Sequence, residues 1–402
     1  MAVIVTAFCL DSLLKIQIGT AFVQLAIPLM LLVPIWYYSF GIKRWANAGS
    51  RLRYDLLFPL LIGYAVLQYG MARSGSAYLM ILSYLVIAYF VYWSVSLAGR
   101  AVDWVALSRY ALILLLVTGF VQYGLKNALG IDLFMRGLDG DYYEGKGTLG
   151  LRMRGFFLEP NWFGLMLFSW LYLFVGGRSR LSYIDKAIVG LSLIALFLSD
   201  NRTILVLLLL LAGYSRIRRY LGPVQWVMPL AVVSLFTGIY IFYSTNCGLV
   251  TDRSASARLC TSGNIIERWE NDDLKTQLFG YGLSNWGSYS NELGFSRSNY
   301  KRDQPLTRRD NAEPYVFLFE MGLFSFLIFA IDLLVVGKRA SRAMDAMFVA
   351  AIYTTALFYP IYTFLPYIFP LAIVRARIFT LPARPRSRAA SASPLATEGA
   401  QR

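Results

Sequence analysis

The sequence contains no histidine, and it is also poor in cysteine and in charged residues. Without histidine, the chain cannot use an imidazole as a general base, a metal ligand or a phosphate carrier. Its 3 cysteines are too few and too scattered for a thiolate metal site. Acid–base chemistry must therefore depend on Asp, Glu, Lys, Tyr or Cys, and we expect no metal and no cofactor.

Charged residues make up only 15% of the chain, against roughly 25% in an ordinary soluble protein. Apolar residues make up 57%, and they form long runs such as 77–97 and 205–211. Continuous runs exclude a β-barrel, because barrel strands alternate apolar and polar residues over short segments. The composition therefore predicts an all-α polytopic membrane protein with about 11–12 transmembrane helices.

Apolar stretches bounded by charged residues predict the positions of these spans. We expect them at residues 18–40, 54–71, 77–97, 104–123, 156–175, 184–199, 203–214, 225–243, 314–336, 346–359 and 361–374. Residues 1–14 are apolar but short and contain Asp11, so they form either an incomplete first span or an interfacial segment.

The loops between these spans predict the orientation. More than half of the 38 Lys and Arg residues fall in one set of short loops and in the C-terminal tail. The positive-inside rule makes these segments cytoplasmic. The long connections 124–155 and 244–313 then lie on the outer face. We expect a transmembrane catalytic domain at 1–379 and a disordered cytoplasmic tail at 380–402, which is rich in Pro, Ala, Ser and Arg.

The net charge of +15 is compatible with a nucleic-acid partner, but the cations lie in short loops between membrane spans. Phosphate-bearing membrane lipids are therefore the expected anionic partners, and no nucleic acid is expected.

Two short hairpins interrupt the regular pattern of spans. Between Lys186 and Arg216, two apolar arms of about 13 residues, or roughly 20 Å of helix, are joined at residues 199–202. Because the hydrocarbon core is roughly 30 Å thick, the turn should end below the far surface. A similar hairpin surrounds Pro360. Broken helices at membrane depth are tolerated where they line protein or water, so we expect a cavity open to the outer face.

The first candidate site begins at the end of the smaller outer loop. Arg152 and Arg154 precede a span, and Glu159 and Asn161 lie where that span begins. Guanidinium groups make bidentate, permanently charged contacts with phosphate. The alternative is an interfacial arginine pair that contacts lipid head groups, with Glu159 as counter-ion.

Arg202 is the second candidate, in the turn of the first hairpin. An arginine below the membrane surface costs roughly 2.5 to 3.5 kcal/mol on insertion scales, so it needs a partner or a function. The alternative is a simple ion pair with Asp200.

The large outer loop supplies the remaining candidates. Its end holds polar side chains at the start of the next span, where a solvated run of charges is the alternative: Arg308, Arg309, Asp310, Asn311 and Glu313. Aromatic and small residues at 279–290 suit sugar faces, although plain loops share this composition. Cys247 and Cys260 bracket a short stretch of the same loop, where an oxidising compartment would allow a disulfide; two unlinked residues are the alternative.

In their order along the chain, these elements resemble the O-antigen ligase and polymerase superfamily of bacterial inner-membrane glycosyltransferases. The similarity covers roughly residues 15–375. It rests on Arg152-x-x-Gly155, Glu159-Pro160-Asn161, Arg202, Gly280-x-Gly282-x-x-Asn285, and Asn311 through Glu320-x-Gly322.

The resemblance implies a C-type glycosyltransferase fold that acts at the periplasmic face on oligosaccharides linked to undecaprenyl pyrophosphate, as both donor and acceptor. An acceptor hydroxyl would attack the anomeric carbon with inversion, while Arg152 and Arg202 stabilise the pyrophosphate leaving group. The base would be Asp310, Glu313 or Glu159, or the reaction would need only a weak base because pyrophosphate is a good leaving group. Substrate contacts would come from Arg154, Asn161, Asn285, Arg308, Arg309 and Asn311. A regulator of chain length is a further candidate partner.

The chain departs from the superfamily at one position. Ligases usually carry a His-Asn pair before the Glu-x-Gly element, whereas this chain has no histidine. A polymerase of O-antigen or exopolysaccharide repeat units is therefore the first hypothesis. A ligase that transfers glycan to the lipid A core, and a lipid-linked glycan flippase or transporter, remain the alternatives. A flippase should need no outer loop as large as 244–313.

Overall fold

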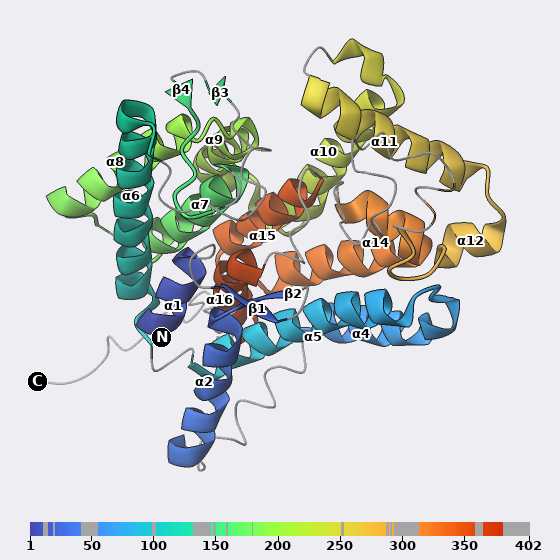
Figure 1. Ribbon diagram of the computed structural model, residues 1–402, viewed down its shortest axis with the longest axis horizontal. Helices are drawn as coiled ribbons and strands as arrows, with labels where there is room; N and C mark the ends of the chain where they lie inside the picture. Colours follow the sequence, from blue (N-terminus) through green and yellow to red (C-terminus); the bar gives the residue numbers. More distant parts are fainter. Residues whose placement is uncertain are drawn as a thin grey trace, which may run out of the picture.

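The computed structural model describes residues 1–10, 15–18, 21–41, 55–98, 102–131, 146–147, 150–157, 160–178, 180–250, 253–286, 289, 292, 313–357 and 365–380. Within these ranges the fold is built mainly from helices (Figure 1).

Each of the expected spans overlaps a helix over the residues that the structure describes. The helices are α1 (Ala2–Cys9), α2 (Ala26–Gly41), α4 (Leu57–Leu67), α5 (Gly75–Ala98), α6 (Trp104–Leu129), α7 (Pro160–Gly176), α8 (Tyr183–Leu198), α9 (Arg202–Ile217), α10 (Met228–Thr245), α11 (Arg253–Glu270), α12 (Leu274–Phe279), α14 (Glu313–Arg339), α15 (Ala343–Ala356) and α16 (Leu365–Thr380). Short 3-10 helices are η2 (Tyr69–Met71), η4 (Arg218–Tyr220), η5 (Gly222–Trp226) and η6 (Cys247–Leu249).

Among the described residues, four helices are long and apolar enough to cross a membrane: α5, α6, α10 and α14 from Tyr315 onward. The segments Ala26–Ile35, Leu57–Leu67 and Ala343–Ala356 are apolar but shorter. The coarse prediction of a helical membrane protein is thus supported, while the full number of spans stays a prediction.

Two small β-structures depart from the expected all-α fold. β1 (Lys15–Ile18) pairs with β2 (Ala21–Gln24) in an antiparallel register, and β3 (Lys146–Gly147) pairs with β4 (Gly150–Leu151). The sequence of β1 alternates polar and apolar residues, which is the period of a strand. The expected span at 18–40 is therefore wrong at its beginning, and its helix starts at Ala26.

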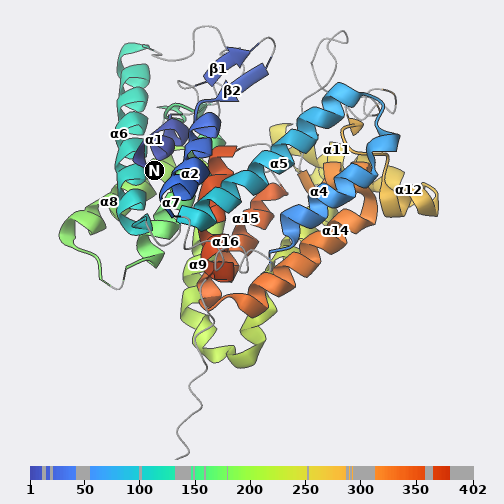
Figure 2. The same ribbon diagram turned by 90° about the horizontal axis from the view of Figure 1, so that it is seen from below.

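The centre of the bundle is formed by the last two helices. Every residue of α15 from Asp345 to Ala356 is buried, and α15 packs between α9 and α10. α16 packs against α5 and α7. Figure 2 shows the same arrangement from below, with α15 and α16 surrounded by earlier helices. α15 and α16 together therefore contact helices from the first part of the chain (α5 and α7) and from later parts (α9 and α10).

The expected hairpin at 184–214 is present as α8 and α9. Ser182 and Asp185 form a capping box at the start of α8, and Asn201 caps α9 by accepting a hydrogen bond from Ile204 N. Asp200 adopts a positive φ of 49° in the turn, a conformation that Asp tolerates better than most residues.

Contacts near helix ends hold neighbouring helices together. Tyr64 of α4 donates to Met321 O of α14 at 2.8 Å, and Met153 N donates to Leu198 O of α8 at 3.0 Å. A Cβ at Gly337 of α14 would lie 2.0 Å from Trp226 O of η5. Which of these helix ends share one side of a membrane stays a prediction of the loop charges.

Candidate functional site

Arg152 joins the first two candidate clusters. Its Nε donates to Ser199 O at 2.8 Å, and its Nη2 donates to Asp200 O at 3.1 Å. The same Nη2 donates to Asn161 Oδ1 at 2.9 Å. Because the two carbonyls belong to the C-terminal end of α8, the guanidinium also sits at the favourable end of that helix dipole. Two clusters that are about 50 residues apart in sequence thus form one site.

The N-termini of α7 and α9 meet beside this arginine. Asn201 Nδ2 donates to Asn161 O at 3.2 Å. Gly164 allows this approach, because a Cβ there would lie 3.0 Å from Asn201 Nδ2. Helix N-termini carry unpaired N–H groups and a partial positive charge, so two of them side by side favour an anion.

The arginines of this site differ in exposure. Arg154 is only 3% exposed, whereas the side chain of Arg202, the first residue of α9, is 78% exposed. Arg202 Nε lies 3.8 Å from Asp200 Oδ1. An exposed ion pair of this kind contributes little, so Asp200 does not hold Arg202 in place. Arg202 is therefore far more accessible than Arg154 to a ligand outside the protein, and Arg152 is half-buried, between the two in exposure.

A second group of predicted residues gathers where the large loop meets α14. Tyr281 N donates to Phe319 O and Gly282 N donates to Glu320 O, both at 2.8 Å. Trp286 N donates to Glu320 Oε1 at 2.9 Å, and Glu320 is fully buried. The Gly-x-Gly and Glu-x-Gly elements, which are about 40 residues apart, are therefore parts of one structural unit.

Glycine is required at two positions of this unit. Gly280 has a φ of 75°, and a Cβ there would lie 2.4 Å from the carbonyl carbon of Glu320. Gly322 has a φ of 64° at a kink in α14, and a Cβ there would lie 2.3 Å from Leu278 O. Any other residue would combine a strained backbone with a collision.

Asn285, a predicted substrate contact, makes structural hydrogen bonds to two other segments. It is buried, and its Nδ2 donates to Met71 O and to Tyr281 O, both at 2.7 Å. Its Oδ1 accepts a hydrogen bond from Arg73 N at 2.9 Å. The amide therefore joins the large loop to the turn between α4 and α5.

The aromatic residues of the large loop pack on each other and on α14. The ring of Tyr281 stacks on Phe319 with a centroid separation of 4.4 Å, and Trp286 packs edge-on against the same ring. Burial raises the pKa of the Tyr281 phenol, and so does its hydrogen bond to Asp272 Oδ2 at 2.6 Å. This packing explains the aromatic composition of the loop without a bound sugar.

The two groups lie at different places in the fold. In Figures 1 and 2, α9 and α12 are well separated. The remaining predicted residues cannot be placed in either group: Glu159, Arg308, Arg309, Asp310 and Asn311 lie outside the described residues, as does the side chain of Glu313, which begins α14.

Cys247 of η6 and Cys260 of α11 form a disulfide, with Cα atoms 5.2 Å apart. It joins the end of α10 to the first long helix of the outer loop. Cys9 is a buried free thiol. Within the described ranges, no three His, Cys, Asp or Glu side chains gather as a metal site.

Sequence reasoning missed a buried ion cluster at the opposite end of the bundle. Arg375 is fully buried between Asp55 and Asp332, and it also donates to the Tyr353 hydroxyl at 3.2 Å. Asp332 lies inside an apolar run, and an acid in that position is costly unless it has a partner. That cost is the signal that could have identified the cluster.

Comparison with known proteins identifies no relative: no family model, no curated protein and no solved structure matches the chain.

Proposed function

We propose that this protein is a glycosyltransferase of the bacterial inner membrane that polymerises oligosaccharide repeat units carried on undecaprenyl pyrophosphate. The main support for the proposal is that hydrogen bonds join Arg152 and Asn161 to the turn that precedes Arg202. This turn lies where the N-termini of α7 and α9 meet. This arrangement suits a phosphate-bearing ligand. The resemblance in motif order supplies the reaction class.

The proposed reaction exchanges one bond at the anomeric carbon of the donor. A hydroxyl of the acceptor sugar forms the new glycosidic bond on the face opposite the leaving group, which inverts the configuration. The bond to the pyrophosphate oxygen breaks, and the lipid pyrophosphate leaves with the electron pair. The hydroxyl proton passes to a carboxylate, for which Glu159, Asp310 and Glu313 are the candidates, or to water.

Arg202 and Arg152 have different roles in this proposal. Arg202, exposed at the start of α9, contacts the pyrophosphate as negative charge develops on it. Arg152 positions the turn through Ser199 O and Asp200 O and adds positive charge behind it. The positive-inside rule places this site on the periplasmic side and the C-terminus in the cytoplasm.

The absence of histidine favours a polymerase over a ligase, and the large outer loop at 244–313 favours either enzyme over a flippase. The test is to delete the gene and to analyse the lipid-linked glycans that accumulate. The proposal predicts single repeat units on the carrier and no long polymer. Full-length polymer that stays on the carrier would instead indicate a ligase, and a carrier glycan that never reaches the outer leaflet would indicate a flippase.

A further inference from the structure

The C-terminal end of α14 meets the segment between α9 and α10. Gly337, in the last turn of α14, packs so closely on η5 that a Cβ there would lie 2.0 Å from Trp226 O. Figure 2 shows the segment between α9 and α10, drawn in yellow-green, beside this end of α14. α10 begins two residues after Trp226, and α14 ends two residues after Gly337. Two helices that are long and apolar enough to cross a membrane therefore have ends at the same level.

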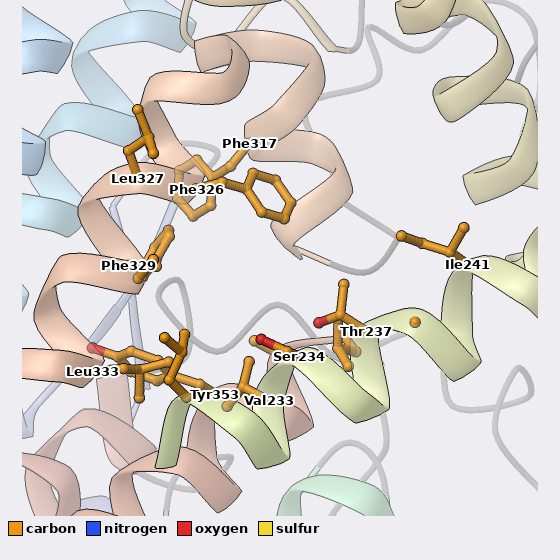
Figure 3. Close-up of a pocket in the computed structure, with 15 residues that line it drawn as sticks. Val233, Ser234, Thr237, Ile241, Phe317, Phe326, Leu327, Phe329, Leu333 and Tyr353 are labelled. Atoms are coloured by element: carbon orange, nitrogen blue, oxygen red, sulfur yellow. The ribbon is translucent and has the colours of Figure 1, made fainter. Parts of the chain in front are cut away.

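The region between these two helices is apolar up to that level. A space of about 400 Å³ lies between them, and Figure 3 shows side chains of α14 facing those of α10 across it. The side chains that line it include no charged residue. Leu230 of the lining lies four residues after Trp226, and Leu333 lies four residues before Gly337. Charges therefore begin where the two helices end, as expected at a boundary between hydrocarbon and head groups.

Cations gather at this boundary without acids between them. Arg216 lies in the last turn of α9, Arg218 and Arg219 lie in η4, and Lys338 directly follows Gly337. Residues 203–251 and 333–344 contain no Asp or Glu. All four cations belong to exposed residues, and within the described part of the chain none of them forms an ion pair. We call these four side chains the basic rim.

Stabilisation of helix ends explains only part of the basic rim. A cation in the last turn of a helix interacts favourably with the helix dipole, and Arg216 and Lys338 hold such positions. Arg218 and Arg219 lie beyond α9, and the effect of the dipole falls off within the last turn. The guanidinium of Arg219 lies 4.7 Å from the ring centroid of Tyr220. The helix dipole therefore does not account for these two arginines.

Exposed apolar and aromatic side chains accompany the cations. Ile217, Tyr220, Val224 and Trp226 are between 45% and 74% exposed. Tyrosine and tryptophan are enriched at membrane interfaces because they combine an apolar body with a polar group. A free phosphate would contact the cations alone and would leave these four side chains in water. A phospholipid suits both parts, because its phosphate pairs with the cations while its glycerol and upper acyl chains cover the apolar side chains.

We propose that the basic rim binds the phosphates of acidic phospholipids in the leaflet that surrounds this end of α10 and α14. Acidic lipids are favoured over zwitterionic lipids because no ammonium group in the lipid offsets their phosphate charge. The positive-inside rule predicts that this is the cytoplasmic leaflet. The proposal rests on the position and contacts of the basic rim, so it does not depend on the reaction class of the protein.

The test variant removes the two arginines that the helix dipole does not explain. Arg218→Gln with Arg219→Gln keeps polar side chains and removes two charges. The matched control is Arg180→Gln with Lys186→Gln. These two residues are also exposed, and Lys186 also lies beside an exposed tyrosine ring, but they flank Asp185, which has no equivalent in the basic rim. Both double variants should unfold at the wild-type temperature in neutral detergent, because exposed substitutions change stability little.

The probe is a phosphatidylglycerol with a photoactivatable group next to its glycerol backbone, added to the purified protein in phosphatidylcholine nanodiscs. We expect it to label peptides that cover residues 216–227. Labelling should fall about tenfold in Arg218→Gln with Arg219→Gln, and by less than about twofold in the control. Arg218→Lys with Arg219→Lys should keep most of the labelling, because attraction to the head group needs the charge rather than the guanidinium fork. Unlabelled phosphatidylglycerol should compete with the probe.

Labelling that stays at the wild-type level after both arginines are removed would overturn the proposal. Equal losses in the test and control variants would also contradict it, because they would indicate attraction by overall charge rather than by a site. If inorganic phosphate competes as well as phosphatidylglycerol, the ligand is a free anion and the lipid assignment is wrong. If a single-stranded oligonucleotide competes better than the lipid, the surface binds nucleic acid instead.

Discussion

Arg375 and Asp55 are 320 positions apart in the chain, yet the arginine donates to both carboxylate oxygens, with Nη2 at 2.5 Å and Nε at 2.9 Å. Asp332 accepts from the other edge of the guanidinium, with Nη1 at 2.8 Å and Nη2 at 2.7 Å. The three side chains are almost completely shielded from solvent. One cation thus joins α16 to α14 and to the residue that precedes α4.

We predict that Arg375→Met destabilises the protein by about 3–5 kcal/mol, because it leaves two buried carboxylates without a partner. Thermal unfolding of the purified protein in detergent measures the loss. Combining Arg375→Met with Asp55→Asn and Asp332→Asn should restore much of the stability, since no buried charge then remains.

Arg342→Met is the control for this cluster. Arg342 is exposed and donates to Gly176 O, so its removal should change stability by no more than about 0.5 kcal/mol. A melting temperature of Arg375→Met equal to that of the wild type would show that the cluster does not stabilise the bundle.

The positions of the helices could be predicted from the sequence because hydrophobic runs and flanking charges are local signals. The turn at Asp200 and Asn201 was predictable for the same reason, because these polar residues are the break between two short apolar segments. The β1–β2 pair was missed because only β1 alternates polar and apolar residues, over four positions, while β2 is mostly apolar and adjoins an apolar run.

The organisation of the candidate site was less predictable, because polar side chains can bind backbone groups as well as ligands. The motif at Asn285 predicts a substrate contact, and it gives no sign of the hydrogen bonds that the amide donates to Met71 O and Tyr281 O. Sequence spacing alone also does not show that Arg152 reaches Ser199 O, because that contact depends on how α7 packs beside α8. Long-range partners of this kind require the tertiary fold.

Gly322→Ala should destabilise the junction between α12 and α14 by about 1–3 kcal/mol or more. The alanine would keep a φ of 64° at the cost of strain, and its Cβ would meet Leu278 O. Limited proteolysis of the outer loop and thermal unfolding measure the effect. Gly190→Ala is the matched control, since its open helical position should tolerate alanine or gain up to about 1 kcal/mol. Equal stability of the two variants would contradict the glycine requirement.

The Cys247–Cys260 disulfide predicts a simple pattern of thiol labelling. Denatured, unreduced protein should take up one alkyl group, at Cys9, and reduced protein should take up three. Replacing both bonded cysteines by serine should cost about 3 kcal/mol, because closing a loop of this length restricts the unfolded chain. Three alkylated cysteines before reduction, in protein purified from the membrane, would contradict the bond.

Arg202 and Arg152 should respond differently to substitution. Arg202 is exposed, so Arg202→Ala should leave folding and insertion near normal. If it contacts the leaving group, its loss should remove about 2.7–4 kcal/mol of transition-state stabilisation, or roughly a hundred- to a thousand-fold in rate. Arg202→Lys should recover only part of this, because an ammonium lacks the planar fork of a guanidinium.

Arg152→Ala, in contrast, should reduce both activity and stability, because it also removes the hydrogen bonds to Ser199 O, Asp200 O and Asn161. Polymer length on gels, scored at matched protein level beside a melting curve, separates the two effects. Asp200→Asn serves as the control for the ion pair, since it removes the carboxylate next to Arg202 and leaves the guanidinium in place. Near-normal polymer from Arg202→Ala would show that the leaving-group role is wrong. If Arg202→Ala and Asp200→Asn also lose equal stability, the arginine is only a structural partner of Asp200.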